Sequence, residues 1–296
     1  MPTNGFRSLL LLLAAATPSL AGNFTFTTIA VPGATTTFLR GINNSGQIVG
    51  DYFDAGGSHA FLYSAGTFTT LNIPDSEAFS INNSGQIVGS TGNDAFFYDG
   101  ATFNILDVPG AQYTQGFGLN DNGAIVGSYG DADGNHGFMY QSGVFQTLNE
   151  PDAVNSTTLR RIDNAGLIVG YGFESFNNAF EYQAGTFTPL AYPGFRPSTD
   201  DVFVQGLNNN GVLVGSAFTN SGGHPFLFSA GLFTSVNLPG TPYGINDLGL
   251  IVGLTAVGNS YVGYLATPEV PEPATSALLA IGALAMLLRK RRLIAS

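Results

Sequence analysis

Short segments of alternating apolar and polar residues run along most of the chain, separated by clusters of glycine, asparagine and proline. One ten-residue stretch, typified by Gly-Ile-Asn-Asn-Ser-Gly-Gln-Ile-Val-Gly, occurs six times, at residues 41–50, 80–89, 118–127, 161–170, 206–215 and 244–253. The glycines that end its Asn- or Asp-rich loop, at positions 46, 85, 123, 166, 211 and 249, are 39, 38, 43, 45 and 38 residues apart. Glycine adopts the left-handed conformation that a tight β-hairpin requires, so each copy predicts a strand, a turn and a second strand.

Two further strands follow each predicted turn. The first contains Phe-x-aromatic, at residues 60–63, 95–98, 137–140, 179–182 and 225–228, with a degenerate sixth copy at 263–266. Aromatic residues two positions apart lie on one face of a strand, so the period is that of β-structure. The second has the form Phe-x-x-apolar-x-x-Pro and begins at Phe68, Phe103, Phe145, Phe187 and Phe233. Its proline ends the ladder of hydrogen bonds, and each complete unit therefore predicts four strands.

The sixth unit lacks the fourth strand, but residues 26–32 near the start of the chain match residues 68–74 almost one for one. We therefore expect the first segment to pair with the stretch around Tyr264 and to close a ring. Residues 22–267 divided by six give 41 residues per unit, within the roughly 40–45 of a four-stranded propeller blade. The sequence predicts an all-β domain at residues 22–267, a six-bladed β-propeller, with an open β-solenoid or a two-sheet sandwich as the alternatives.

The first 21 residues are predicted to be a signal peptide. Arg7 is followed by an apolar stretch at residues 8–16, and the small residues Ser19 and Ala21 fit a signal-peptidase site with cleavage before Gly22. The β domain is therefore expected outside the cytoplasm.

The last residues of the sequence predict a membrane anchor. A linker at residues 268–273 ends in Pro271, Glu272 and Pro273, and a mainly apolar run follows at residues 274–288. As a transmembrane helix this run spans about 22 Å, short for a hydrocarbon core of about 30 Å, but flanking arginines can compensate. The basic tail, residues 289–296 with Arg289, Lys290, Arg291 and Arg292, is expected to stay cytoplasmic.

This order of Pro-Glu-Pro, short apolar helix and arginine cluster resembles the PEP-CTERM sorting tail of Gram-negative bacteria. The resemblance implies recognition of Pro271, Glu272 and Pro273 by an exosortase-type processing peptidase, with the basic residues as a stop. It also implies transient anchoring in the inner membrane and a final place in the periplasm, the outer envelope or the extracellular space. A plain anchor behind an accidental Pro-Glu-Pro spacer is the alternative. The repeats resemble HAF-type extracellular repeats, whose His-Ala-Phe triplet stands at residues 59–61.

Charge narrows the range of partners. The formal net charge is −11, and residues 22–268 hold four arginines and no lysine against 18 acidic residues, which gives −14. Phosphate-binding surfaces need clusters of basic residues, so we expect no binding to nucleic acid. The absence of cysteine excludes disulfides, thiol nucleophiles and Cys-ligated zinc.

Few residues of the sequence are candidates for a metal site or a catalytic site. His59, His136 and His224 stand at one position of their units and would form a metal site only if they face a common channel; local roles within each blade are the simpler interpretation. Asp131 and Asp133 alternate as in a calcium loop but lack the EF-hand glycine and final acid, which favours a polar hairpin tip. The adjacent pair at positions 160 and 161 is interpreted as solvated arginines at a strand start, with an anion site as the alternative. No catalytic set and no cofactor is predicted.

The sequence therefore favours an exported envelope or extracellular protein with a binding or structural role. It favours a protein without catalytic activity over an enzyme. The sorting-tail resemblance implies an association with exopolysaccharide or a biofilm matrix, and the ligand would be a polysaccharide or a protein. The alternative is a propeller hydrolase or lyase that acts on an extracellular polymer, with acids and histidines gathered at one channel mouth.

Overall fold

The computed structural model describes residues 23–269, except 152, 154, 155, 174–176, 197, 198 and 259. The predicted signal peptide, the membrane helix and the sorting residues from Pro271 to Arg292 lie outside the described residues. Asn23–Pro268 form one compact unit, and all regular structure described in it is β. Within the described residues, no helix has the length and apolar character that crossing a membrane requires.

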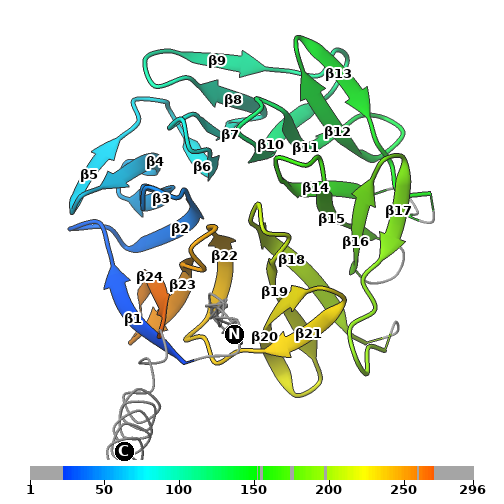
Figure 1. Cartoon of the computed structure of the whole chain (residues 1–296). Coiled ribbons are helices and arrows are strands. Elements are labelled where there is room, and N and C mark those ends of the chain that lie inside the picture. The colour runs from blue at the N-terminus through cyan, green and yellow to red at the C-terminus, as the bar shows by residue number, and fades with distance from the viewer. Residues whose placement is uncertain are drawn as a thin grey trace, which may run out of the picture. The chain divides into compact units, whose positions relative to one another are not determined.

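The described residues form 24 strands (Figure 1). In chain order these are β1 (Phe24–Ile29), β2 (Thr36–Ile42), β3 (Ile48–Asp54), β4 (Gly57–Ser64), β5 (Thr67–Thr70), β6 (Ser76–Ile81), β7 (Ile87–Thr91), β8 (Asp94–Tyr98), β9 (Phe103–Leu106), β10 (Tyr113–Leu119), β11 (Ile125–Gly130), β12 (Asn135–Gln141), β13 (Val144–Thr147), β14 (Thr157–Ile162), β15 (Ile168–Phe173), β16 (Asn177–Gln183), β17 (Thr186–Pro189), β18 (Asp201–Leu207), β19 (Leu213–Thr219), β20 (Gly222–Ser229), β21 (Leu232–Ser235), β22 (Thr241–Ile245), β23 (Ile251–Val257) and β24 (Ser260–Pro268).

These strands form blade-like antiparallel sheets around a common axis, with β2, β6, β10, β14, β18 and β22 innermost (Figure 1). Among the described residues there are four sheets of four strands and one of eight. The sequence predicts six separate blades, and the difference comes from one parallel pair, Thr36 with Tyr261, which joins β2 to β24. Without that pair, the eight-stranded sheet consists of two antiparallel groups, β2–β5 and β22–β24 with β1.

The six predicted hairpin turns are confirmed. Each turn glycine has a positive φ, from 71° at Gly211 to 82° at Gly166, which a residue with a Cβ adopts only under strain. The Asn or Asp three positions before the glycine fixes the loop, as at Asn43, whose side-chain Oδ1 accepts hydrogen bonds from the backbone N–H groups of Ser45 and Gln47. The same two bonds recur in the other five turns.

The core lies between neighbouring sheets and is filled by the predicted aromatic strand. Phe61, Phe96, Phe138 and Phe226 have no exposed surface, and each belongs to an apolar cluster with branched residues of the adjacent sheet. Because each sheet buries one face against the next, every sheet stabilises two neighbours.

The ring closes through the first strand of the described chain. β1 pairs antiparallel with β24 over six residues, from Phe24 opposite Pro268 to Ile29 opposite Gly263. This confirms the predicted pairing with the stretch around Tyr264. The inner strands also meet across the closure, because the Asn246 amide donates to the backbone carbonyl of Asn43 at 3.0 Å.

The pairing of β1 with β24 predicts that an engineered disulfide can join the two strands without any change in the backbone. Thr25 and Thr267 are exposed and directly opposite each other, at a separation that suits a disulfide between antiparallel strands. Since the natural chain has no cysteine, the T25C/T267C variant should oxidise to one intramolecular bridge, seen as a two-hydrogen mass loss and faster migration on a non-reducing gel. The T25C/S260C pair is the matched control, because Ser260 lies at the other end of β24 and should stay reduced. Reduced thiols in the first variant would contradict the closure.

Candidate functional site at the centre of the ring

Each innermost strand carries a β-bulge at the same place. The register shifts in β2 between Leu39 and Gly41, and the other five inner strands shift at the equivalent position. The extra residues are Arg40, Phe79, Phe117, Arg160, Gln205 and Tyr243, and we call them the bulge ring. A bulge re-aims the side chain and carbonyl of the extra residue, here at equivalent places in all six inner strands.

The residue after each bulge is small in five strands and arginine in the sixth. Gly41, Ser80, Gly118, Gly206 and Gly244 occupy the five small positions, and Arg161 occupies the sixth. A Cβ placed on Gly118 would lie only 2.9 Å from the Arg160 carbonyl oxygen and the Arg161 Cα, so neighbouring inner strands touch through their backbones there. The small residues leave space that the single long side chain of Arg161 occupies.

Arg161 binds the backbone of five inner strands at once. Its Nη1 donates to the carbonyl oxygens of Phe117 (2.8 Å) and Arg160 (2.9 Å). Its Nη2 donates to those of Arg40 (3.2 Å), Phe79 (3.2 Å) and Tyr243 (3.1 Å). Only 6 % of Arg161 is exposed, so these carbonyls replace water around the guanidinium.

No carboxylate pairs with Arg161 among the salt bridges of the described residues. Burial lowers the pKa of Arg161 well below its ordinary value, and the positive charges of Arg160 and Arg40 lower it further. Charge-assisted hydrogen bonds to the five carbonyls offset this cost, and three of these carbonyls share the two N–H groups of Nη2. The arginine therefore locks the inner strands together.

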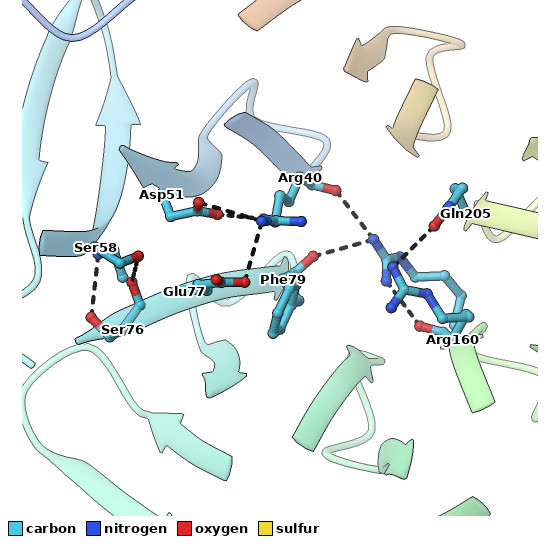
Figure 2. A network of polar contacts seen from close by, with 10 residues as sticks. Arg40, Asp51, Ser58, Ser76, Glu77, Phe79, Arg160 and Gln205 are labelled. Carbon is cyan, nitrogen blue, oxygen red and sulfur yellow. Dashed lines mark hydrogen bonds and ion pairs between the residues drawn. The ribbon is translucent and has the colours of Figure 1, made fainter. Parts of the chain in front are cut away.

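Arg40 forms a charged group with two carboxylates on the same side of the axis (Figure 2). Its Nε donates to Asp51 Oδ1, and its Nη2 donates to Asp51 Oδ2 (3.3 Å) and Glu77 Oε2 (3.2 Å). Burial raises the pKa of Asp51 to about 6, although Arg40 acts in the opposite direction and Glu77 adds to the rise. Burial alone would lower the pKa of Arg40, but Asp51 and Glu77 raise it.

Arg160 lies on the opposite side of the bulge ring, and no carboxylate pairs with it among the ion pairs of the described residues. Its guanidinium carbon sits 4.3 Å from the centroid of the Phe117 ring, and its Nη2 donates to Gln205 Oε1 at 3.0 Å (Figure 2). Its Nε is buried and has no hydrogen-bond partner among the described residues, and the residue as a whole is 9 % exposed. Burial lowers the pKa of Arg160, while the nearby Tyr171 acts in the opposite direction.

On the other side of Arg161 the six hairpin turns form a continuous belt. Its members are the second residues of each turn, Asn44, Asn83, Asp121, Asn164, Asn209 and Asp247, and we call them the asparagine ring. The backbone N–H of each donates to a side-chain oxygen of the next at 2.7–3.0 Å, and the sixth bond returns to Asn44. Partial burial raises the pKa of Asp121, but bonds from Asn164 and Asn83 outweigh it and hold the pKa below its ordinary value.

The asparagine ring and Arg161 line an open hollow of about 70 Å³. A volume of this size holds a few water molecules and is far below the roughly 300 Å³ of a typical small ligand pocket. A larger hollow of about 500 Å³ lies at the periphery, lined by residues of β5, β8 and β9 that include Thr70, Tyr98 and Phe103.

The three histidines lie in three different hairpins, each close to the loop that joins its two strands. His59 Nε2 bonds Asp54 Oδ1 (3.0 Å), His136 Nε2 bonds Asp131 Oδ1 (3.1 Å), and His224 Nε2 bonds Ser221 Oγ (2.8 Å). The described residues contain no group of three or more His, Asp or Glu side chains that could hold a metal ion. Equivalent positions therefore serve equivalent hairpins, and they do not converge.

Asp131 and Asp133 lie at the tip of the β11–β12 hairpin. The Asp133 backbone N–H donates to Asp131 Oδ1 at 2.8 Å, and this bond is the main cause of a lowered pKa at Asp131. The oxygen pattern that suggests calcium is thus used within the turn itself.

The interpretation of Arg160 and Arg161 as solvated residues is wrong. Both are buried at the axis, because the bulge turns one carbonyl inward and the small neighbours leave room for a long side chain. The signal was present in the repeats: position 161 aligns with Gly41, Ser80, Gly118, Gly206 and Gly244, and a charge at a position reserved for small residues indicates a special role.

Residues 269–292 match the family described as the PEP-CTERM protein-sorting motif, which covers the predicted sorting tail. The motif implies export, sorting by an exosortase, membrane anchoring and association with the cell envelope. No curated protein matches the chain in sequence.

Solved structures resemble the described domain in fold. Regucalcin from Agrobacterium tumefaciens, described as a calcium-binding protein, has a TM-score of 0.54 at 12 % identity over 84 % of this chain and 95 % of its own. The β-propeller domain of the Trilobed protease from Pyrococcus furiosus has 0.54 at 11 % identity over 82 % and 86 %. A luciferin-regenerating enzyme has 0.52 at 13 % identity over 83 % and 95 %. At such identities the likeness shows a propeller-like fold and nothing about activity.

Loss of the central guanidinium should destabilise the whole ring. R161M keeps much of the volume but leaves five inward carbonyls without a donor, so we expect a loss of at least about 3 kcal/mol and a melting temperature lower by about 6–12 °C. R161K, with three donors, should fall between. The control is R196M, because the Arg196 side chain is 56 % exposed, and its buried partner Asp200 keeps hydrogen bonds from the Arg196 backbone N–H and the Thr199 hydroxyl. Equal melting temperatures for R161M and R196M would refute the role of Arg161.

Asp51 should give stability an unusual dependence on pH. Its folded pKa of about 6 exceeds the ordinary value of about 4, so between these values the folded state binds more protons than the unfolded state. Its contribution therefore rises as pH falls from 7 to 4, by about 2 kcal/mol, relative to the D51N variant, which cannot titrate.

Urea unfolding of wild type and D51N at pH 4, 5, 6 and 7 measures this difference. D54N is the matched control, because hydrogen bonds from Gly56 and His59 lower the pKa of the exposed Asp54, and its contribution should be lost on acidification. Parallel curves for wild type and D51N would rule out the titration of Asp51 in this range.

Proposed function

We propose that this chain is an exosortase-sorted envelope protein whose β domain is a rigid six-bladed ring that binds or organises polymer outside the cell without catalysis. The single observation that carries the proposal is the sorting motif at residues 269–292, which follows β24 directly. Export and sorting deliver the domain to the envelope, where a rigid surface can contact matrix material.

The count of six blades rests on the repeats and on the hydrogen bonds. One parallel pair, between Thr36 and Tyr261, joins the two antiparallel groups of the eight-stranded sheet, whereas β23 and β24 share seven pairs. A single bridge is a contact between blades, so we treat these groups as two blades and obtain six with the four separate sheets. The asparagine ring, with one member from each hairpin turn, has the same six-fold order.

The chemistry of the axis supports binding over catalysis. Asp51, whose pKa burial raises to about 6, has no exposed surface, and both of its oxygens accept hydrogen bonds from Arg40. His59 and His136 are held by carboxylates at hairpin tips, away from the inner strands. A general acid or base must reach its substrate, so these groups favour a structural role over the hydrolase or lyase alternative.

The remaining features extend the same proposal. We take residues 1–21 as a signal peptide, residues 274–288 as the transient anchor, and residues 289–296 as the cytoplasmic tail. We also retain the relation to HAF-type repeats and the association with exopolysaccharide or biofilm matrix as proposals. The peripheral hollow supports binding, because its lining includes the aromatic rings of Tyr98 and Phe103 and the hydroxyl of Thr70.

Substitution of Pro271, Glu272 and Pro273 by alanine should block processing. We expect an unprocessed, full-length chain that stays in the membrane fraction, because the peptidase loses its recognition residues. Immunoblots of membrane, periplasmic and extracellular fractions measure size and location together. The T275A/S276A variant is the control, since it leaves Pro-Glu-Pro intact and should be processed normally. Normal processing of the triple variant would refute exosortase sorting and leave only a plain anchor.

A further inference from the structure

The bulge side of the axis concentrates positive charge in an acidic domain. Residues 22–268 contain four arginines, no lysine and 18 acidic residues. Arg40, Arg160 and Arg161 all lie at the axis, and of these only Arg40 has carboxylate partners among the described residues. The centre of this side thus carries more positive than negative charge, although the domain as a whole is negative.

Arg160 is the member of this group whose hydrogen-bonding capacity is least used. It donates to the neutral Gln205 and stacks on Phe117, and its buried Nε has no partner in the part of the chain that the structure describes. A guanidinium presents a planar fork of donors that matches a carboxylate, and an unpaired buried donor is costly. An anionic oxygen from outside the chain, bound at the edge of this guanidinium, would neutralise the charge that no carboxylate in the salt bridges of the described residues neutralises.

Half-buried aromatic side chains lie on the same strands as the bulge ring, two residues before it. Phe38 and Phe203 lie two residues before Arg40 and Gln205 on their strands, on the same strand face, and both are half-buried. The Arg40 guanidinium lies 4.5 Å from the Phe38 centroid, and Tyr243 lies 6.3 Å from the Phe38 ring. Flat aromatic faces beside hydrogen-bonding groups suit the apolar faces of sugar rings.

We propose that the bulge side of the axis binds a carboxylate-bearing sugar, such as a uronic acid unit of a polysaccharide, with its carboxylate on Arg160 and its ring against Phe203 or Phe38. The inference rests on the proposed binding function and names its ligand class. The domain as a whole carries a charge of −14, so a carboxylate-bearing sugar is attracted only where the arginines gather, at the axis. The half-buried amide of Gln205 and carboxylate of Glu77 offer partners for sugar hydroxyls.

Calorimetric titration of the full chain in detergent tests this proposal with tetragalacturonate as the probe. Galactotetraose of the same length supplies the neutral arm, and sodium acetate supplies the carboxylate without a sugar. We expect tetragalacturonate to bind at least tenfold more tightly than either. If galactotetraose binds as tightly as tetragalacturonate, the carboxylate has no role and the proposal is wrong. If acetate binds as tightly, the site recognises an anion alone, and the proposal that it binds a sugar is wrong.

Two variants locate the site. R160Q should weaken tetragalacturonate binding at least tenfold, and R196Q, at an arginine away from the axis, should leave it unchanged. Circular dichroism reports whether R160Q folds; if it does not, F203A takes its place and should weaken binding at least threefold. Unchanged binding in the folded variant would overturn the site. Sorting of R160Q is followed separately, since normal processing with lost binding supports this inference, while failed sorting of wild type would disprove the function on which it rests.

Discussion

Five inward-pointing backbone carbonyls share one positive charge, that of Arg161. Carbonyl dipoles that converge on an axis repel one another and are cut off from water, so a ring of bulged strands needs a donor at its centre. A guanidinium has five N–H donors in one plane and carries a permanent charge, which makes it the side chain best able to bond several carbonyls together. The inner strands can approach the axis this closely because the Arg161 guanidinium fills the space between them.

The bulges, the small residues and the asparagine ring are consequences of that arrangement. Glycine or serine beside each bulge lets the inner strands approach to backbone contact, and the approach brings the hairpin turns within hydrogen-bond distance of one another. Aromatic residues then fill the widening space between sheets toward the periphery. Packing between sheets and bonding around the axis thus support one another, and loss of either is felt by the whole domain.

Much of this fold was predictable from the sequence. Six similar turns, Phe-x-aromatic strands and a displaced opening segment gave the strand order and the pairing of β1 with Tyr264, because each depends on local pattern and repetition. The axial site was not predicted. Arg161 departs from its repeat, and its role depends on carbonyls from residues up to 121 positions away, which a local pattern does not reveal. Asp51 and Glu77 gain their importance from a shared partner, Arg40, that lies on a different strand from either.

The position of β24 has a mechanical consequence. This strand leads directly into the sorting motif, so any pull from a membrane tether reaches the domain through Pro268. Seven residue pairs with β23 and six with β1 hold it from both sides. A force along β24 loads many hydrogen bonds in shear at the same time instead of breaking them one after another. The pairing of β1 with β24 therefore strengthens the strand that connects the domain to the sorting motif.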